Sequence, residues 1–178
     1  MKAHVQRFPV VIPPGFAPIE LCKRAGKECP GQDAPLYKPR WGGGFNAPRG
    51  PQRTPHRAMD IMAAIGAHVV AVDDGVVQER WRYKGQVRPG AGESTKGGYY
   101  VRVQHSWGVS YYAHLHEAPL VAPGDVIKAG QQLGIVGRSG NAKPGCPHCH
   151  FSIQVGKALV DPYPYLLPLF QAGQWKGE

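Results

Sequence analysis

The chain has 178 residues, with 21 Lys and Arg against 12 Asp and Glu, which gives a formal net charge of +9. A chain of this length forms one domain, or one domain with an arm, and its 42% of apolar residues argues against wholesale disorder. The 24 glycines and 18 prolines break helices, so the composition excludes a helix bundle and predicts short strands joined by loops.

Neither a membrane span nor a nucleic-acid surface is predicted. No apolar stretch approaches the roughly 20 residues that cross a bilayer, so we expect no transmembrane segment. The N-terminal apolar run at 8–12 stops at Pro13-Pro14, and no signal peptide is predicted. Basic residues are scattered, with no run longer than Lys23-Arg24. This pattern argues against nucleic acid and leaves an acidic wall polymer or a membrane surface as anionic partners.

The first half of the chain predicts an arm, a loop and two strands. Residues 1–38 are Pro-rich with little periodicity and predict an extended arm or a segment that wraps around the domain, whereas glycine and proline make 39–60 a long loop. The β-branched run at 67–72 is followed by Asp73-Asp74-Gly75 and a second apolar stretch. That pattern predicts a strand, a tight turn and a second strand.

The second half predicts further strands and no helix. Residues 82–98 are polar and Gly-rich, which predicts a surface excursion long enough to serve a function. No segment shows the periodicity of an amphipathic helix, so the predicted fold class is mainly β, with an antiparallel sheet. The remaining strands are expected at 99–105, 109–115, 121–128, 132–136 and 151–155.

Five of the eight histidines fall within positions 105–150. His148 and His150 begin a predicted strand, and the period of two in a strand places both imidazoles on the same face. His114 and His116 repeat this spacing at the end of another predicted strand. This clustering makes a metal or catalytic site more credible than any single histidine would.

Upstream, His56 and Asp60 lie four residues apart, close enough in a turn for both side chains to reach one ion. Two neutral imidazoles and one carboxylate form a three-ligand zinc set that leaves a fourth position for water. Zinc in such a set lowers the pKa of bound water to roughly 7, whereas a structural zinc site more often closes with four protein ligands. The open set therefore favours catalysis.

Three motifs carry a resemblance to a known family. His56-Arg57-Ala58-Met59-Asp60, Tyr112-Ala113-His114-Leu115 and His148-Cys149-His150 stand in the order and spacing of the M23 metallopeptidases. These are the lysostaphin-like zinc endopeptidases that cut peptidoglycan peptides. The resemblance implies a lysostaphin-like (duplicated hybrid motif) domain, in which an antiparallel sheet forms a groove walled by loops.

The resemblance also divides the chain. Residues 66–77 resemble the strand pair of the family, and residues 121–137 resemble the hairpin before its last motif. An M23-like peptidase domain is therefore expected at 39–166. It would lie between the Pro-rich arm at 1–38 and a C-terminal tail at 167–178.

Carried over residue by residue, the family pattern makes His56, Asp60 and His150 the zinc ligands. It makes His114 and His148 an unliganded catalytic pair. One imidazole of the pair would take a proton from the zinc-bound water, and the other would stabilise the developing oxyanion. Which residue performs which role is left open.

Several residues depart from the family pattern or lie beside it. The family usually has Gly at Ala58 and Leu at Cys149, and often an acidic residue at Ser152, but none of these departures removes a ligand. Family members often have a histidine at the position of His105, which would either orient a catalytic neighbour or bond a backbone group at a strand end. His116 is expected to face solvent.

The four cysteines offer a rival metal site and a disulfide pattern. Cys146 and Cys149 resemble half of a zinc ribbon, but Cys22 and Cys29 are too far apart for the other half and no second knuckle follows. Two disulfides, or one disulfide and two free thiols, are expected, with Cys22–Cys29 the favoured pair. Cys149 should point away from the histidines beside it. Disulfides would indicate an oxidising compartment.

The function that the resemblance implies is zinc-dependent hydrolysis of peptide bonds in peptidoglycan cross-links or stem peptides, outside the cytoplasm. The alternative is a non-catalytic member of the same fold that binds wall peptides or regulates an amidase. Such proteins typically lack zinc ligands, whereas this chain keeps all of them. The cleaved bond, the biological role and any inhibitor or immunity protein are left open by the sequence.

Overall fold

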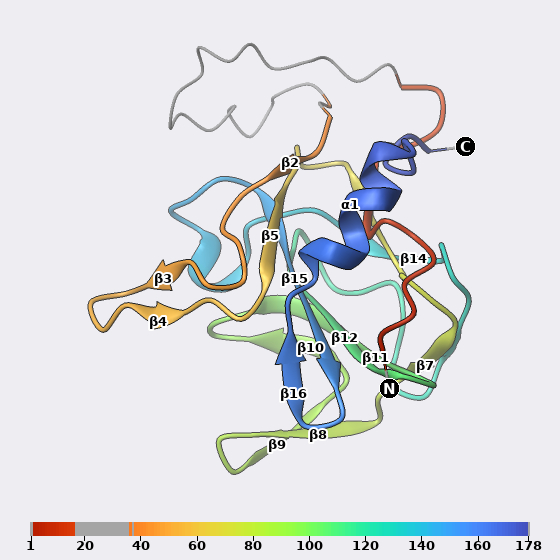
Figure 1. The fold of residues 1–178 in the computed structure, drawn as a ribbon. Coiled ribbons are helices and arrows are strands. Elements are labelled where there is room, and N and C mark those ends of the chain that lie inside the picture. Colours follow the sequence, from red (N-terminus) through yellow and green to blue (C-terminus); the bar gives the residue numbers. More distant parts are fainter. Residues whose placement is uncertain (1, 17–35, 37, 178) are drawn as a thin grey trace.

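The computed structural model describes residues 2–16, 36 and 38–177 (Figure 1), and in this part of the chain the main sheet is antiparallel with nine strands. The strands are β2 (Arg40–Trp41), β5 (Met59–Met62), β7 (Gly75–Val77), β10 (Ala91–Ser94), β11 (Gly98–His105), β12 (Gly108–Leu115), β13 (Val126–Ile127), β15 (His148–Val155) and β16 (Ala158–Val160). Their order is β13-β7-β11-β12-β15-β5-β2, with β10 pairing with β11 and β16 with β15. The predicted fold class is confirmed.

Smaller elements complete the fold. A second antiparallel sheet has the order β1-β6-β14, and two hairpins pair β3 with β4 and β8 with β9. The bounds are β1 (Val10–Val11), β3 (Pro48–Arg49), β4 (Thr54–Pro55), β6 (His68–Val70), β8 (Arg80–Tyr83), β9 (Gln86–Pro89), β14 (Gln132–Ile135), the 3-10 turn η1 (Gly140–Ala142) and the helix α1 (Tyr163–Gln171). The strands β9 and β10 lie within the predicted surface excursion at 82–98, and β8 overlaps its start.

Two predicted strand pairings are wrong. The expected strands at 67–72 and 76–77 exist as β6 and β7, but β6 pairs with β1 and β14, whereas β7 pairs with β11 and β13. Residues 121–137 likewise form no hairpin, because β13 joins the main sheet and β14 the smaller one. Each connection crosses between sheets, so the apolar side chains of both sheets meet in one core.

The helix α1 was not predicted. The segment Tyr163–Gln171 is apolar at almost every position, so it shows no contrast between a buried and an exposed face, and it contains two prolines. One proline stands in the first turn, where a missing N–H costs nothing, and Pro168 lies inside the helix. Packing holds this helix in place, because the Phe170 ring lies 5.1 Å from Trp41 and 5.4 Å from Phe8.

The described start of the N-terminal segment belongs to the core. Phe8, Val10 and Ile12 are at most 1% exposed, and β1 adds a strand beside β6. The boundaries expected at 1–38, 39–166 and 167–178 stay predictions.

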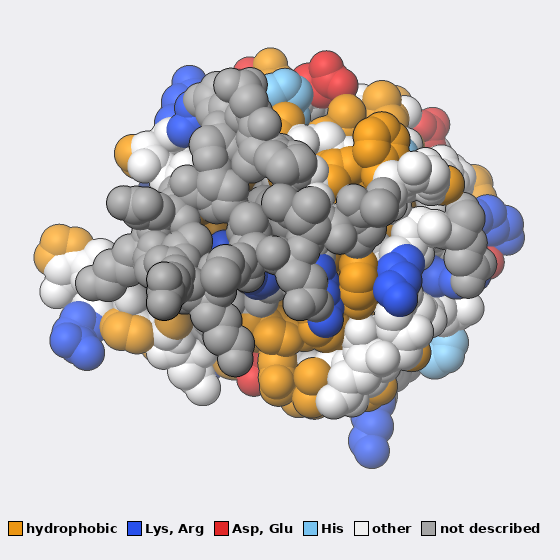
Figure 2. All heavy atoms as spheres, turned by 90° about the horizontal axis from the view of Figure 1, so that it is seen from above, with side chains coloured by type: hydrophobic (Ala, Val, Ile, Leu, Met, Phe, Trp, Pro, Cys, Tyr) orange, Lys and Arg blue, Asp and Glu red, His pale blue; other side chains and the backbone are white. Residues whose placement is uncertain are grey.

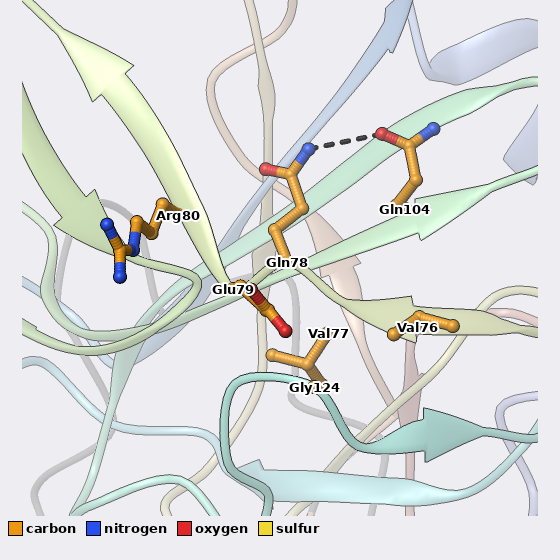
Figure 3. A pocket seen from close by; sticks show the side chains of 7 residues that line it. All are labelled: Val76, Val77, Gln78, Glu79, Arg80, Gln104 and Gly124. Carbon is orange, nitrogen blue, oxygen red and sulfur yellow. Dashed lines mark hydrogen bonds between the residues drawn. The ribbon is translucent and has the colours of Figure 1, made fainter.

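The two faces of the main sheet differ in character. On β15 the side chains of Phe151 and Ile153 lie in the core, and those of His150 and Ser152 project from the opposite face. On that opposite face the side chain of Gln78, which follows β7, donates a hydrogen bond of 3.1 Å to the side chain of Gln104 of β11 (Figure 3). We call this face of the sheet, which carries His150 and Ser152, the histidine face.

The surface carries dispersed positive charge. On the side seen in Figure 2, Lys and Arg side chains are spread over the described residues and form no single stripe. Within the described residues no helix is long and apolar enough to cross a membrane.

Candidate metal centre

Strand pairing brings the last motif against two other strands. On β15, His150 stands opposite Asp60 of β5 and Ala113 of β12. The intervening Cys149 is fully buried in the core, so His148 and His150 share the histidine face as predicted. Period-two alternation thus positions one histidine directly across from the carboxylate of the first motif.

A local turn carries His56 to the same place. Arg57, the next residue, has a left-handed φ of 59°, and its N–H donates to Phe45 O at 2.7 Å. His56 Nδ1 lies 3.1 Å from Gly43 O and 3.3 Å from Gly44 O, and because a carbonyl only accepts, the ring donates through Nδ1–H. His56 Nε2 therefore carries the lone pair.

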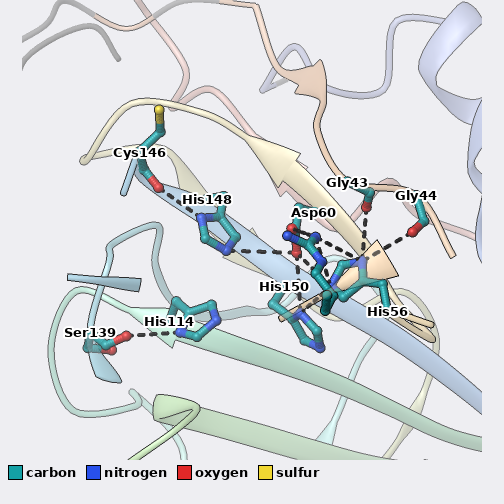
Figure 4. A network of polar contacts seen from close by, with 10 residues as sticks. Gly43, Gly44, His56, Asp60, His114, Ser139, Cys146, His148 and His150 are labelled. Atoms are coloured by element: carbon teal, nitrogen blue, oxygen red, sulfur yellow. Dashed lines mark hydrogen bonds and ion pairs between the residues drawn. The ribbon is translucent and has the colours of Figure 1, made fainter. Parts of the chain in front are cut away.

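The three predicted ligands form a nearly equilateral triangle (Figure 4). His56 Nε2 lies 3.0 Å from His150 Nδ1, and each of these nitrogens lies 3.2 Å from Asp60 Oδ1. Tetrahedral zinc with bonds of about 2.0–2.1 Å holds its ligand atoms about 3.3 Å apart. The spacing and the donor types, two nitrogens and one oxygen, therefore fit a zinc ion. They leave one of four positions without a protein ligand.

Burial and charge prepare the carboxylate for a cation. The Asp60 side chain is only 8% exposed, and burial alone would raise its pKa, but the interactions with His150 and His56 outweigh burial. The pKa of Asp60 is therefore held well below its ordinary value, and the group is ionised at neutral pH. Burial lowers the pKa of His150, which favours the neutral imidazole that a metal requires.

Arg49 of β3 places a positive charge against the same ligands. Its Nη2 contacts Asp60 Oδ2 and lies 3.1 Å from Nδ1 and 3.3 Å from Nε2 of His56. The guanidinium is about half exposed, so it reaches the carboxylate from the solvent side. The Arg49 guanidinium thus offsets the charge of the Asp60 carboxylate, beside the position where the three donor atoms could hold a metal.

The predicted catalytic pair lies beside the triangle. The rings of His114 and His148 have centroids 4.8 Å apart, and the His114 ring lies 5.8 Å from that of His150. His114 Nδ1 donates to Ser139 O at 2.9 Å, and His148 Nδ1 donates to Cys146 O at 2.8 Å. Each imidazole consequently keeps a lone pair on Nε2, the form that accepts a proton.

His114 reaches this face through an irregular backbone. Its φ is 64°, and it stands at a register shift where Tyr100 opposes Ala113 but Tyr99 opposes Leu115. Such a bulge turns one side chain away from the face that alternation would give it. Burial, followed by the electrostatic interaction with neighbouring His148 and His150, lowers the pKa of His114 to about 4, so this imidazole is neutral near pH 7.

The other histidines of the cluster lie elsewhere. His105 donates from Nδ1 to Asp74 O at 2.8 Å and bonds Ser110 Oγ through Nε2 at 2.7 Å. Both contacts belong to a buried network away from the triangle, so the backbone-partner alternative fits His105. His116 is exposed, as expected.

The cysteines form no described metal cluster. Cys149 is a free, buried thiol, and burial raises its pKa, which leaves it unreactive. Cys146 is disulfide-bonded. The expected Cys22–Cys29 pair lies outside the described residues. The single group of potential metal ligands among the described residues is the His56, Asp60 and His150 triangle.

Comparison with known proteins agrees with this geometry. Residues 54–162 match the model of Peptidase family M23, and that range contains all three motifs. The chain belongs to the M23 family.

Relatives within M23 are distant but share the fold. The peptidoglycan DD-endopeptidase ShyC of Vibrio cholerae is 30% identical over 118 residues, 66% of this chain and 24% of ShyC. The catalytic domain of the antimicrobial peptidase lysostaphin from Staphylococcus simulans is 29% identical, with a TM-score of 0.59 over 72% of this chain and 92% of that domain. A zinc-containing peptidase from Vibrio cholerae is also 29% identical, with a TM-score of 0.56 over 68% of this chain and 35% of that one.

This M23 chain is therefore a metallopeptidase-family domain with a candidate His-Asp-His metal site, and it spans about a quarter of the length of the first curated relatives that it matches. The five site residues predicted from the motifs come together in space, and their roles stay proposals. Sequence reasoning missed Arg49, because nothing in its spacing from the motifs marks it. It also missed the carbonyl groups that fix the imidazole tautomers, since any residue type supplies a carbonyl.

Proposed function

We propose that this M23 chain is a zinc-dependent endopeptidase that hydrolyses peptide bonds in peptidoglycan cross-links or stem peptides. The observation that carries the proposal is the triangle of His56, Asp60 and His150 with two further imidazoles beside it on one sheet face. Three ligands alone would suit a metal-binding module. The adjacent pair of imidazoles adds the proton-transfer groups that hydrolysis requires.

The chain supplies complementary groups for that reaction. Zinc held by His56, Asp60 and His150 would polarise the scissile carbonyl and provide a nucleophile at neutral pH. His148 Nε2 lies 3.7 Å from Asp60 Oδ1, within reach of a proton released beside the ligands. One imidazole of the pair, His114 or His148, can accept that proton at Nε2 and return it to the leaving amine. The other would hydrogen-bond the developing oxyanion once its own Nε2 carries a proton.

The substrate class rests on the relatives and on the open sheet face. ShyC is named for peptidoglycan and lysostaphin for antimicrobial peptidase activity. Peptidoglycan is a wall polymer, so we place the activity outside the cytoplasm. Hydrolysis of wall peptides also suits a protein of net charge +9, because its substrate bears free carboxylates.

The test is release of amino groups from purified cell walls. The zinc-loaded protein should liberate peptides, a chelator should stop the release, and added zinc should restore it. A non-catalytic wall-binding protein would sediment with the walls and release nothing. That result, obtained with protein shown to contain one zinc per chain, would refute the proposed function.

A further inference from the structure

A second set of polar side chains lies along the histidine face, away from the predicted metal ligands. Arg102 of β11 stands opposite Tyr111 of β12, and Tyr111 stands opposite Ser152 of β15, so all three share a face with His150. The Tyr111 ring lies 6.1 Å from the His150 ring. The metal site and Arg102 are thus joined through one aromatic side chain.

Arg102 is a desolvated cation without an acidic partner. Its guanidinium lies 4.3 Å from the Trp81 ring centroid and 5.8 Å from that of Tyr111. Nε donates to Gln78 at 2.9 Å and an Nη donates to Gln154 at 3.4 Å. Among the described residues no carboxylate lies within ion-pair distance of Arg102, although burial lowers its pKa, as expected for a charge removed from water.

These side chains line a hollow of about 460 Å³ that contains no acidic group. Its polar lining consists mainly of three arginines and three glutamines: Gln78, Arg80, Arg82, Arg102, Gln104 and Gln154. An adjoining hollow shares Gln78, Arg80 and Gln104 and holds Glu79 (Figure 3). No ion pair joins Arg80 or Arg82 to a described carboxylate. The positive charge of the hollow lined by Arg102 therefore has no internal counter-charge.

We propose that this hollow is a subsite for a carboxylate of the substrate peptide, several residues from the scissile bond. The inference rests on the proposed function, and it adds a chemical requirement on the substrate. From His150 to Gln154 the strand advances four residues, about 13 Å, a span that about four residues of an extended peptide cover. Guanidinium groups match carboxylates in a bidentate geometry.

A peptide is favoured over a phosphate-bearing wall polymer by the position of the hollow. It lies on the same sheet face as the metal ligands and connects to them through Tyr111, so a chain seated across His150 can extend to Arg102. A phosphate-bearing polymer that is not cleaved does not require a binding site on the same sheet face as the metal ligands. The hollow would then select peptides with a free carboxyl group over amidated ones.

The test compares native peptidoglycan with the same material after carbodiimide-mediated amidation of its carboxyl groups. Two variants remove charge from the hollow: Arg102→Gln, and the exposed double variant Arg80→Gln/Arg82→Gln, which perturbs packing less. The control is Lys157→Gln, an equal loss of charge on an exposed residue outside the hollow. For the hollow variants we expect the native substrate concentration at half-maximal rate to rise about tenfold, the value for a charge-assisted contact, with an unchanged maximal rate.

Amidated substrate should be handled equally by wild type and hollow variants, and Lys157→Gln should resemble wild type on both. Equal losses on both substrates, or no loss on either, would overturn the subsite while leaving the endopeptidase intact. If wild type cleaves neither substrate, the proposed function fails, and co-sedimentation with the two substrates still decides the subsite. If stripping phosphodiester-linked polymers from the walls abolishes the arginine dependence, the ligand is polymer phosphate and the peptide subsite is refuted.

Discussion

His114 and His148 face each other with ring centroids 4.8 Å apart, and each donates its Nδ1–H to a backbone carbonyl. The two acceptors, Ser139 O and Cys146 O, come from different turns of the loop that precedes β15. Backbone groups thus orient both bases whether or not substrate is bound. This preorganisation is what a proton-transfer pair needs, because reorientation during the reaction would cost rate.

Replacement of either base should lower turnover and leave the metal in place. We expect His148→Gln and His114→Asn to reduce the rate of wall hydrolysis about 10²- to 10⁴-fold, the usual contribution of a general acid or base. Asn suits position 114 because it tolerates left-handed backbone better than Ala does. Metal content by mass spectrometry should stay at one zinc per chain. A variant that retains the wild-type rate would remove that residue from the catalytic pair.

Arg49 should oppose zinc binding, because a guanidinium and a divalent cation compete for the same carboxylate. Arg49→Gln is expected to raise zinc affinity about twofold to fivefold, the range for a half-exposed ion pair. Arg53→Gln on the same hairpin, an exposed residue with no described ion pair, serves as the control for the loss of charge. Competition against a fluorescent chelator measures the affinity. Equal zinc affinities for wild type, Arg49→Gln and Arg53→Gln would contradict this prediction, because Arg49 would then not compete with zinc for Asp60.

The buried His105 should make stability fall in mild acid. Burial lowers the pKa of His105 in the folded chain below its ordinary value of 6.5, so the unfolded chain binds the proton first. Its contribution is complete above pH 6.5 and is lost as the pH falls from there toward the folded pKa. The free energy of unfolding, measured with urea at pH 7.5 and 5.5, should therefore drop less for His105→Gln than for wild type. The exposed His116→Gln should follow wild type. An equal drop in all three proteins would exclude His105 as a source of the acid-dependent loss of unfolding free energy.

Phe8 should anchor the N-terminal segment to the helix α1. It is 1% exposed and its ring lies 5.7 Å from Trp41 and 5.4 Å from Phe170. Phe8→Ala should reduce the free energy of unfolding by about 3–5 kcal/mol through lost burial and a cavity. Val87→Ala, at an exposed position of β9, should change it by less than about 0.5 kcal/mol. A loss below 1 kcal/mol for Phe8→Ala would mean that this segment packs only loosely.

Much of the sheet and of the site could be predicted, because both depend on local pattern. The strands expected at 99–105, 109–115 and 151–155 correspond to β11, β12 and β15. Alternation alone placed His148 and His150 together and Cys149 in the core. The spacing of His56 and Asp60, four residues apart, likewise predicted that both side chains can reach one position, and the structure brings them within 3.2 Å of each other.

Features set by long-range packing could not be predicted. Strict alternation would place His114 on the core side with Tyr112, and only the bulge with φ 64° turns it toward His148. The partners of β6 and β7 depend on how two sheets bury their apolar faces, which the local turn signal at 73–75 does not encode. Arg49 and Arg102 reach their positions through strand pairings that no single-sequence pattern specifies.

The central claim is that His56, Asp60 and His150 hold one zinc ion. Anomalous diffraction at the zinc edge, from crystals of the zinc-loaded protein, tests it most directly. The account predicts one strong peak about 2.0–2.1 Å from His56 Nε2, His150 Nδ1 and a carboxylate oxygen of Asp60. A principal peak at any other group of side chains, with this triangle left without one, would contradict the account.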